Sequence, residues 1–202
     1  MKRVCSLILA LLWPAMAAMA APSGEGLSLD RISAYLNSFR TAEGTFTQIT
    51  DDGRTSTGRL MIRRPGRLRF DYDPPNEALV VANGDTVAIV DPASNVSPQG
   101  YPLFTTPLKI ILARRVDLGA ERMVVARATN GETTTIRAQD PKNPEIGSID
   151  LTFSHDPVRL TQWVINDAAG ANTVVKLDSL ETGVTLRDEL FTLPGADTRL
   201  DR

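Results

Sequence analysis

The sequence predicts a mainly antiparallel β protein preceded by one amphipathic helix, and three observations lead to this fold class. From Glu43 onward, short runs rich in β-branched residues alternate with turn residues, which is typical of antiparallel sheets. Hairpin dipeptides such as Asn83-Gly84 separate successive runs, so neighbours in the sequence become neighbours in the sheet. Residues 67–72 alternate strictly between apolar and charged side chains, which predicts a strand with one buried and one wet face.

The helix is expected directly after Ser28, whose side chain can cap its first turn. Its apolar residues recur at spacings of three and four and therefore form one stripe, made of Leu29, Ile32, Leu36 and Phe39. We expect one amphipathic helix of about three turns, with its polar residues facing water.

Eleven segments have the composition and turn boundaries of strands. They are residues 44–50, 55–63, 67–72, 77–82, 86–91, 122–129, 133–139, 148–154, 159–166, 173–180 and 185–191. Tight turns are predicted at Asp52-Gly53, Asn83-Gly84 and Asn130-Gly131. Residues 91–101 hold two prolines together with serine, asparagine and glycine, and we interpret them as a loop.

A short second helix is predicted over residues 108–115, because Pro107 suits the first helical position. One side of it carries Leu108, Ile111 and Leu112, whereas Ile110 points nearly the opposite way. The segment therefore needs apolar partners on more than one side. These partners could belong to another helix of an ordinary core, or to a binding partner that is present only part of the time.

The first 20 residues have the order of a secretory signal peptide. A basic start, Met1-Lys2-Arg3, precedes a short apolar run and the small residues Ala18-Met19-Ala20, so cleavage is expected after Ala20. Residues 21–202 would then form a single exported domain, expected to be monomeric. No later stretch approaches the roughly 20 apolar residues of a membrane-spanning helix.

Charge and cysteine content exclude several classes of function. The chain has 22 basic and 24 acidic side chains; loss of Lys2 and Arg3 leaves 20 basic ones and a net charge of −4. A mildly acidic protein is a poor partner for nucleic acid. The only cysteine, Cys5, lies in the predicted signal, so no disulfide, thiolate nucleophile or cysteine metal site is expected.

No catalytic residue, metal site or cofactor is predicted. The one histidine, His155, stands between Ser154 and Asp156, and adjacent residues of a turn cannot build a triad. We expect an exposed turn histidine. The acidic pairs Asp51-Asp52 and Asp188-Glu189 lie at predicted turns or strand ends, where solvated acids are ordinary.

Four arginines surround the turn at Pro65-Gly66, namely Arg63, Arg64, Arg67 and Arg69. They could form a phosphate-binding patch, but no aromatic residue interleaves with them on the same face. The simpler interpretation is a solvated strand face, balanced by Asp71, Asp73 and Glu77.

Taken in order, the short motifs of the chain resemble those of the outer-membrane lipoprotein carrier protein (LolA) family. After the signal and helix come 44–48 (GTFTQ), 58–60 (GRL), 64–70 (RPGRLRF), 83–84 (NG), 106–108 (TPL) and 190–194 (LFTLP). Each motif is weak evidence alone, but in this order the motifs span nearly the whole mature chain.

This resemblance implies an incomplete antiparallel β-barrel of about eleven strands, covered on its concave side by a lid of short α-helices. It also implies a periplasmic carrier for acylated lipoproteins. The carrier would receive them from an inner-membrane ATP-driven transporter and deliver them to the outer membrane, in many bacteria to a lipid-anchored receptor.

The resemblance further implies roles for individual residues. Arg64 matches the family arginine that bonds lid carbonyls and keeps the cavity shut, while the second arginine, Arg63, could share this role. The expected cavity and lid residues are Leu68, Phe70, Leu108, Ile110, Ile111 and Leu112.

Two other classes of function stay open at this point. A periplasmic sensor or regulator could use a similar half-barrel, with a lipid-like ligand that changes a protein contact. A lipid or glycan hydrolase would need a carboxylate pair assembled from distant strands.

Overall fold

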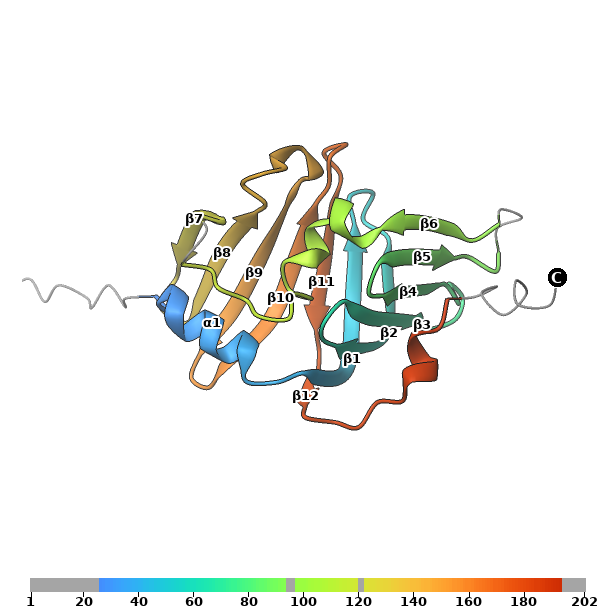
Figure 1. Ribbon diagram of the computed structural model, residues 1–202, viewed down its shortest axis with the longest axis horizontal. Coiled ribbons are helices and arrows are strands. Elements are labelled where there is room, and N and C mark those ends of the chain that lie inside the picture. Colours follow the sequence, from blue (N-terminus) through green and yellow to red (C-terminus); the bar gives the residue numbers. More distant parts are fainter. Residues whose placement is uncertain (1–25, 94–96, 120–121, 194–202) are drawn as a thin grey trace, which may run out of the picture.

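In the computed structural model, residues 26–93, 97–119 and 122–193 are described, and their twelve strands form one antiparallel sheet (Figure 1). The strands are β1 (Thr41–Thr50), β2 (Thr55–Arg63), β3 (Arg67–Tyr72), β4 (Leu79–Asn83), β5 (Thr86–Val90), β6 (Gln99–Pro102), β7 (Val124–Thr129), β8 (Thr133–Gln139), β9 (Ser148–His155), β10 (Val158–Asn166), β11 (Asn172–Leu177) and β12 (Glu181–Thr182). The predicted signal peptide, residues 1–20, lies outside the described residues.

The strands follow the order β6-β5-β4-β3-β2-β1-β11-β10-β9-β8-β7, and the short β12 also pairs with β1. The sheet is therefore a meander in which β1 meets β11 at the centre, and its two end strands, β6 and β7, do not pair with each other. This open, curved sheet confirms the predicted mainly β fold.

One α-helix, α1 (Leu29–Asn37), and four 3₁₀ helices accompany the sheet in the described part of the chain. The 3₁₀ helices are η1 (Leu103–Thr105), η2 (Pro107–Lys109), η3 (Pro144–Ile146) and η4 (Asp188–Phe191). As predicted, Ser28 caps α1: its hydroxyl accepts the backbone N–H of Arg31 at 3.2 Å, and Ile32 and Leu36 are buried.

Each face of the sheet is covered by a different part of the chain. On the concave side, α1 and residues 103–118 pack on a core that includes Leu60, Ile62 and Leu68 (Figure 1). On the convex side, Met61 packs against Leu186 and Phe191. Because successive residues of β2 point to opposite faces, three residues in a row are buried there.

Ten of the eleven predicted strands overlap with observed ones, and three keep their predicted bounds, at 55–63, 67–72 and 133–139. The predicted turns are present as well. Gly53, Gly84 and Gly131 have φ values of 80°, 118° and 90°, which glycine adopts without the steric cost of a Cβ atom.

The prediction of a strand at residues 185–191 is wrong. Residues 188–191 form the 3₁₀ helix η4, which crosses the convex face, and Asp188 pairs there with Arg63 and Arg67. The apolar residues Leu186 and Phe191 are held by contact with Met61 rather than by a partner strand.

The predicted loop at 91–101 contains the first residues of a further strand, β6. All four residues of β6 are exposed, and it pairs only with β5. An edge strand tolerates Gly100 and Pro102, which would be unusual in a central strand.

The predicted α-helix at 108–115 is also wrong. The chain forms the 3₁₀ helix η2 and then irregular turns, although Pro107 does occupy the predicted start. Ile110, Ile111 and Leu112 are all buried, and three consecutive buried side chains do not fit one face of a regular helix.

Candidate functional site

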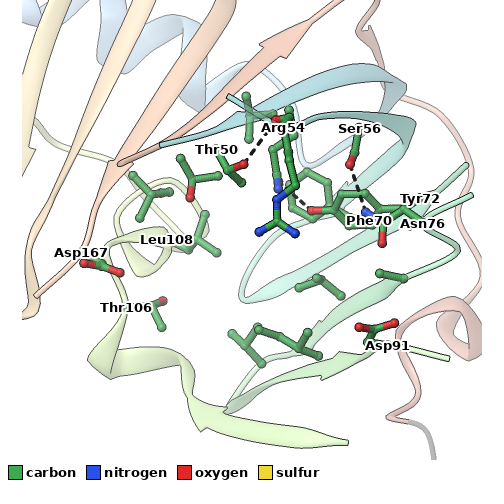
Figure 2. Close-up of a pocket in the computed structure, with 18 of the residues that line it drawn as sticks. Thr50, Arg54, Ser56, Phe70, Tyr72, Asn76, Asp91, Thr106, Leu108 and Asp167 are labelled. Carbon is green, nitrogen blue, oxygen red and sulfur yellow. Dashed lines mark hydrogen bonds between the residues drawn. The ribbon is translucent and has the colours of Figure 1, made fainter. Parts of the chain in front are cut away.

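A cavity of about 1330 Å³ lies between the concave face of the sheet and residues 105–108 (Figure 2). Its volume exceeds the range of roughly 300–1,000 Å³ that is usual for drug-sized ligands. The floor is apolar and is contributed by five strands, β3, β4, β5, β10 and β11, through Phe70, Val80, Val87, Ile165 and Val175. Leu108 of η2 adds an apolar side chain from the covering side. The site is therefore large enough and apolar enough for a long aliphatic ligand.

Aromatic rings close the floor of the cavity. The ring of Phe70 lies edge-to-face on Phe46 at 4.9 Å and on Trp163 at 6.2 Å between centroids. Phe46 contacts Tyr72 in the same way at 5.2 Å. Edge-to-face pairs stabilise such a cluster beyond the burial of its area, so this wall of the cavity is firmly packed.

Tyr72 adds a polar group to this wall. Its hydroxyl donates a hydrogen bond of 2.7 Å to Oε1 of Gln48. Burial raises the pKa of Tyr72 to about 12, so the side chain is a neutral phenol at every physiological pH.

Residues 103–118, here called the covering segment, cross the concave face from the edge of the sheet to α1 (Figure 1). At one end of the segment, the backbone N–H of Leu103 donates to the carbonyl oxygen of Asp85 at 2.7 Å. In the middle, the carbonyl oxygen of Leu112 accepts the backbone N–H of Gly66 at 2.8 Å. Besides Pro107, the segment buries six apolar side chains, namely Leu103, Ile110, Ile111, Leu112, Val116 and Leu118.

The far end of the covering segment is fastened to α1 by hydrogen bonds. Asn37 binds the backbone of Val116 twice: its Nδ2 donates to the carbonyl at 2.7 Å, and its Oδ1 accepts the N–H at 3.0 Å. The hydroxyl of Ser33 accepts the N–H of Leu118 at 3.1 Å. The covering segment and α1 are thus joined to each other by side chains of α1.

An ion pair also holds the covering segment. Nζ of Lys109 bonds Oδ2 of Asp140, which follows β8. This bond, together with one from Nδ2 of Asn143, holds the pKa of Asp140 well below its usual range.

Arg64 lies beneath the end of α1 and is buried, with 6% of its surface exposed. Its Nη2 donates to the carbonyls of Leu36 and Phe39, and the guanidinium carbon lies 5.0 Å from the centre of the Phe39 ring. The last carbonyls of a helix lack partners within the helix and attract cations. Arg64 therefore connects β2 and β3 to the helix that holds the covering segment.

The position of Arg64 also carries a cost. Its Nε and Nη1 atoms are buried without a hydrogen-bond partner among the described residues, and no carboxylate pairs with it there. Burial lowers the pKa of Arg64, because desolvation disfavours the charged form. A buried guanidinium bound only to carbonyls is a weaker anchor than a buried ion pair would be.

The six predicted cavity and lid residues fall into two groups. Phe70 and Leu108 line the cavity. The other four, Leu68, Ile110, Ile111 and Leu112, lie in the closed core between the covering segment and the sheet. Arg63 does not approach α1: it bonds the carbonyl of Leu186 and the carboxylate of Asp188 on the convex face.

Sequence reasoning missed most of the floor. Tyr72 could have been included, because it alternates with Leu68 and Phe70. Ile165 and Val175 come from β10 and β11, about a hundred residues further along the chain, and no local pattern relates them to Phe70.

The sequence suggested that acidic residues nearby in the chain balance the four arginines on a solvated strand face, and this holds for one of them. Arg69 pairs with Asp71, but Arg63 and Arg67 pair with Asp188 of η4 rather than with Asp73 or Glu77. Arg64 points to the opposite face of the sheet.

The histidine and the acidic pairs, for which no catalytic role was predicted, make structural contacts. His155 is half-buried rather than exposed, and its Nε2 lies 2.8 Å from the hydroxyl of Thr134. Asp51 accepts the N–H of Asn172, and Asp188 binds two arginines. Among the described residues no group of His, Cys, Asp and Glu side chains could hold a metal ion. No helix in the same part of the chain is long and apolar enough to cross a membrane.

An open, curved sheet with an apolar cavity under a covering segment defines the class of half-barrel binding proteins. Within this class, the chain belongs to the family of the outer membrane lipoprotein carrier protein LolA, whose sequence profile matches residues 37–194. Members of this family bind their ligands without enzymatic activity, which confirms the prediction that the protein is not an enzyme.

Two relatives illustrate the similarity, both named outer-membrane lipoprotein carrier protein. One, from Pseudomonas aeruginosa (strain UCBPP-PA14), is 25% identical over 195 residues, which cover 91% of this chain and 92% of the relative. The other, from Coxiella burnetii (strain RSA 331 / Henzerling II), is 38% identical over 178 residues, 84% of this chain and 83% of the relative. A solved LolA superfamily protein from Nitrosomonas europaea aligns with a TM-score of 0.41 and 11% identity, over 83% of this chain and 99% of that one.

Proposed function

We propose that this protein carries the acyl chains of lipoproteins between the inner and the outer membrane. The observation that carries the proposal is the apolar cavity of about 1330 Å³ beneath the covering segment. Relatives of the chain are named lipoprotein carriers. Long acyl chains left in water cost roughly 0.8 kcal/mol for each methylene, so a carrier must hide them.

The covering segment makes exchange with a ligand energetically plausible. Burying an aliphatic side chain is worth roughly 1.5–3 kcal/mol, so its six buried side chains contribute on the order of 9–18 kcal/mol. Acyl chains that displaced them would regain the same free energy with roughly 11–22 buried methylenes. The net change in free energy between the closed and the acyl-bound state is therefore small, so neither loading nor release is strongly unfavourable.

In this proposal Arg64 is the latch of the closed state. It holds the end of α1 through two carbonyls, and α1 holds the covering segment through Asn37. Because two nitrogen atoms of Arg64, Nε and Nη1, have no partner among the described residues, opening costs less than the rupture of a fully satisfied buried ion pair. The latch is thus firm enough to close the cavity and weak enough to open.

The remaining parts of the proposal concern location and partners. After export and cleavage behind Ala20, the protein would work in the periplasm. There it would accept lipoproteins from an inner-membrane ATP-driven transporter and deliver them to the outer membrane or to a receptor on it.

Isolation of the protein from cells tests the proposed function directly. A tagged chain purified from the periplasmic fraction should carry acylated lipoproteins, identified by mass spectrometry of the acylated amino-terminal peptides. Depletion of the protein should leave lipoproteins in the inner membrane. Purification without acylated cargo, together with normal lipoprotein sorting after depletion, would refute the proposal.

The latch is tested by replacing Arg64 with leucine. Since R64L removes both bonds to α1, we expect a weaker closed state, tighter retention of acyl cargo and slower delivery to acceptor membranes. The matched control is R63L, which removes an arginine bound only on the convex face. Full delivery by R64L at native expression, or equal defects in both variants, would contradict the assigned role.

A further inference from the structure

The polar rim of the cavity is acidic. Three carboxylates contribute to its lining, those of Asp73, Asp91 and Asp167, against one basic side chain, that of Arg54. All three acidic residues are exposed, and each adds one formal negative charge to the rim. Figure 2 shows Asp91 and Asp167 on different sides of the pocket, so the acidic charges do not lie at one point.

These three charges are not neutralised within the described residues. Asp73 accepts a bond of 2.7 Å from the hydroxyl of Thr57, and Asp91 accepts the N–H of Ala93 at 3.0 Å. Asp167 accepts two backbone N–H groups, those of Ala169 and Ala171. Each carboxylate is therefore fixed by neutral donors, while none takes part in an ion pair with a described basic side chain.

The one basic residue of the rim is already paired. Nε of Arg54 lies 2.7 Å from a carboxylate oxygen of Asp52, and the side chain of Arg54 is 81% exposed. With this charge balanced, a ligand whose acyl chains lie on the apolar floor presents its head group to a rim of net negative charge.

We propose that Asp73, Asp91 and Asp167 determine specificity: they admit acyl chains attached to an uncharged head and reject anionic lipids of equal chain length. The inference rests on the proposed function and adds the class of ligand to it. The acylated end of a lipoprotein, with thioether, ester and amide links, carries no phosphate. Anionic phospholipids have the same chains, so an apolar floor alone cannot distinguish the two. The carboxylates at the rim repel an anionic head group and leave the apolar contacts with the acyl chains unchanged, so they distinguish the two kinds of ligand.

The test compares two ligands with the same single acyl chain, an uncharged monoacylglycerol and an anionic lysophosphatidylglycerol. Both are used below their aggregation limits to displace a fluorescent acyl probe from the full-length mature protein. The variant is D73N/D91N/D167N, because asparagine retains a side-chain oxygen that can accept the same bonds from neutral donors. The matched control is E132Q/D156N/E181Q, which removes three exposed acidic charges outside the cavity lining.

We expect the wild-type protein to favour the uncharged ligand, and the rim variant to bind the anionic ligand about tenfold more tightly than the wild type does. The affinity for monoacylglycerol and all affinities of the control should stay within about twofold. In the wild-type protein, higher salt should narrow the difference between the two ligands, since salt screens exposed charges. If the triple variant does not fold, the salt dependence of the wild-type protein alone tests the specificity inference.

The two proposals fail in different ways. If the wild-type protein binds neither ligand, the proposed function fails, and the specificity inference fails with it. If it binds both ligands equally at low and high salt, or if the rim variant changes both affinities alike, the specificity inference is overturned while the carrier function stands.

Discussion

Replacing Leu112 by alanine is expected to strengthen acyl binding although it weakens the fold. Leu112 is 1% exposed and belongs to the covering segment, yet it does not line the cavity. Removing a buried leucine side chain costs about 2–5 kcal/mol. If cargo displaces the covering segment, this loss falls on the closed state and not on the acyl-bound state. At the lower limit of about 2 kcal/mol, the affinity for an acyl probe should rise about 30-fold.

Fluorescence titration with an acyl probe measures the affinity, and urea unfolding measures the stability. The control is I136A, which truncates a buried side chain of β8 that lies outside both the covering segment and the cavity lining. It should lose comparable stability with no gain in affinity. An unchanged or reduced affinity in L112A would refute the idea that the covering segment and the acyl chains compete for the same space.

Two further predictions concern stability. In G58A the new methyl group would overlap the carbonyl oxygen of Asp71 and come within 2.9 Å of the Phe46 ring, so we expect a loss of about 2 kcal/mol or more in urea unfolding. Unchanged stability would contradict this close approach of β3 and Phe46 to Gly58. D140N should be less stable than the wild type at pH 7. Because the pKa of Asp140 is lowered in the folded state, its contribution is complete above the ordinary carboxyl pKa of about 4 and declines as the pH falls below that value. The difference between the two proteins should therefore shrink in acid, and a constant difference from pH 7 to pH 3 would show that the Lys109 contact is not electrostatic.

Local patterns predicted the parts of the fold that local forces determine. Ser28 and the apolar stripe after it define α1, since capping and helical periodicity act within a few residues. The bounds of β2 and β3 followed from glycine turns and strict alternation. In each case the residues that determine the element lie inside it or directly beside it.

The secondary-structure predictions are wrong where contacts between residues far apart in the sequence determine the local conformation. Residues 185–191 alternate like a strand, but Asp188 is bound by Arg63 and Arg67, more than a hundred residues earlier. Residues 108–115 have good helix formers, but burial of three consecutive side chains against the sheet prevents a regular helix.

The candidate site was predictable only in part, for the same reason. Arg64, Phe70 and Leu108 belong to short motifs that a resemblance can identify. The rest of the floor and the acidic rim exist only because β3, β10 and β11 curve around one space. Asp167 lies in a turn that looks ordinary in the sequence, and its position at the cavity follows from the tertiary fold alone.

Amide hydrogen exchange with and without a synthetic triacylated lipopeptide shows whether acyl chains displace the covering segment. Bound lipopeptide should speed exchange at residues 103–118 and slow it in β3 and β11, which form part of the floor. If residues 103–118 stay equally protected in the saturated complex, the acyl chains do not displace the covering segment and the proposed exchange is wrong.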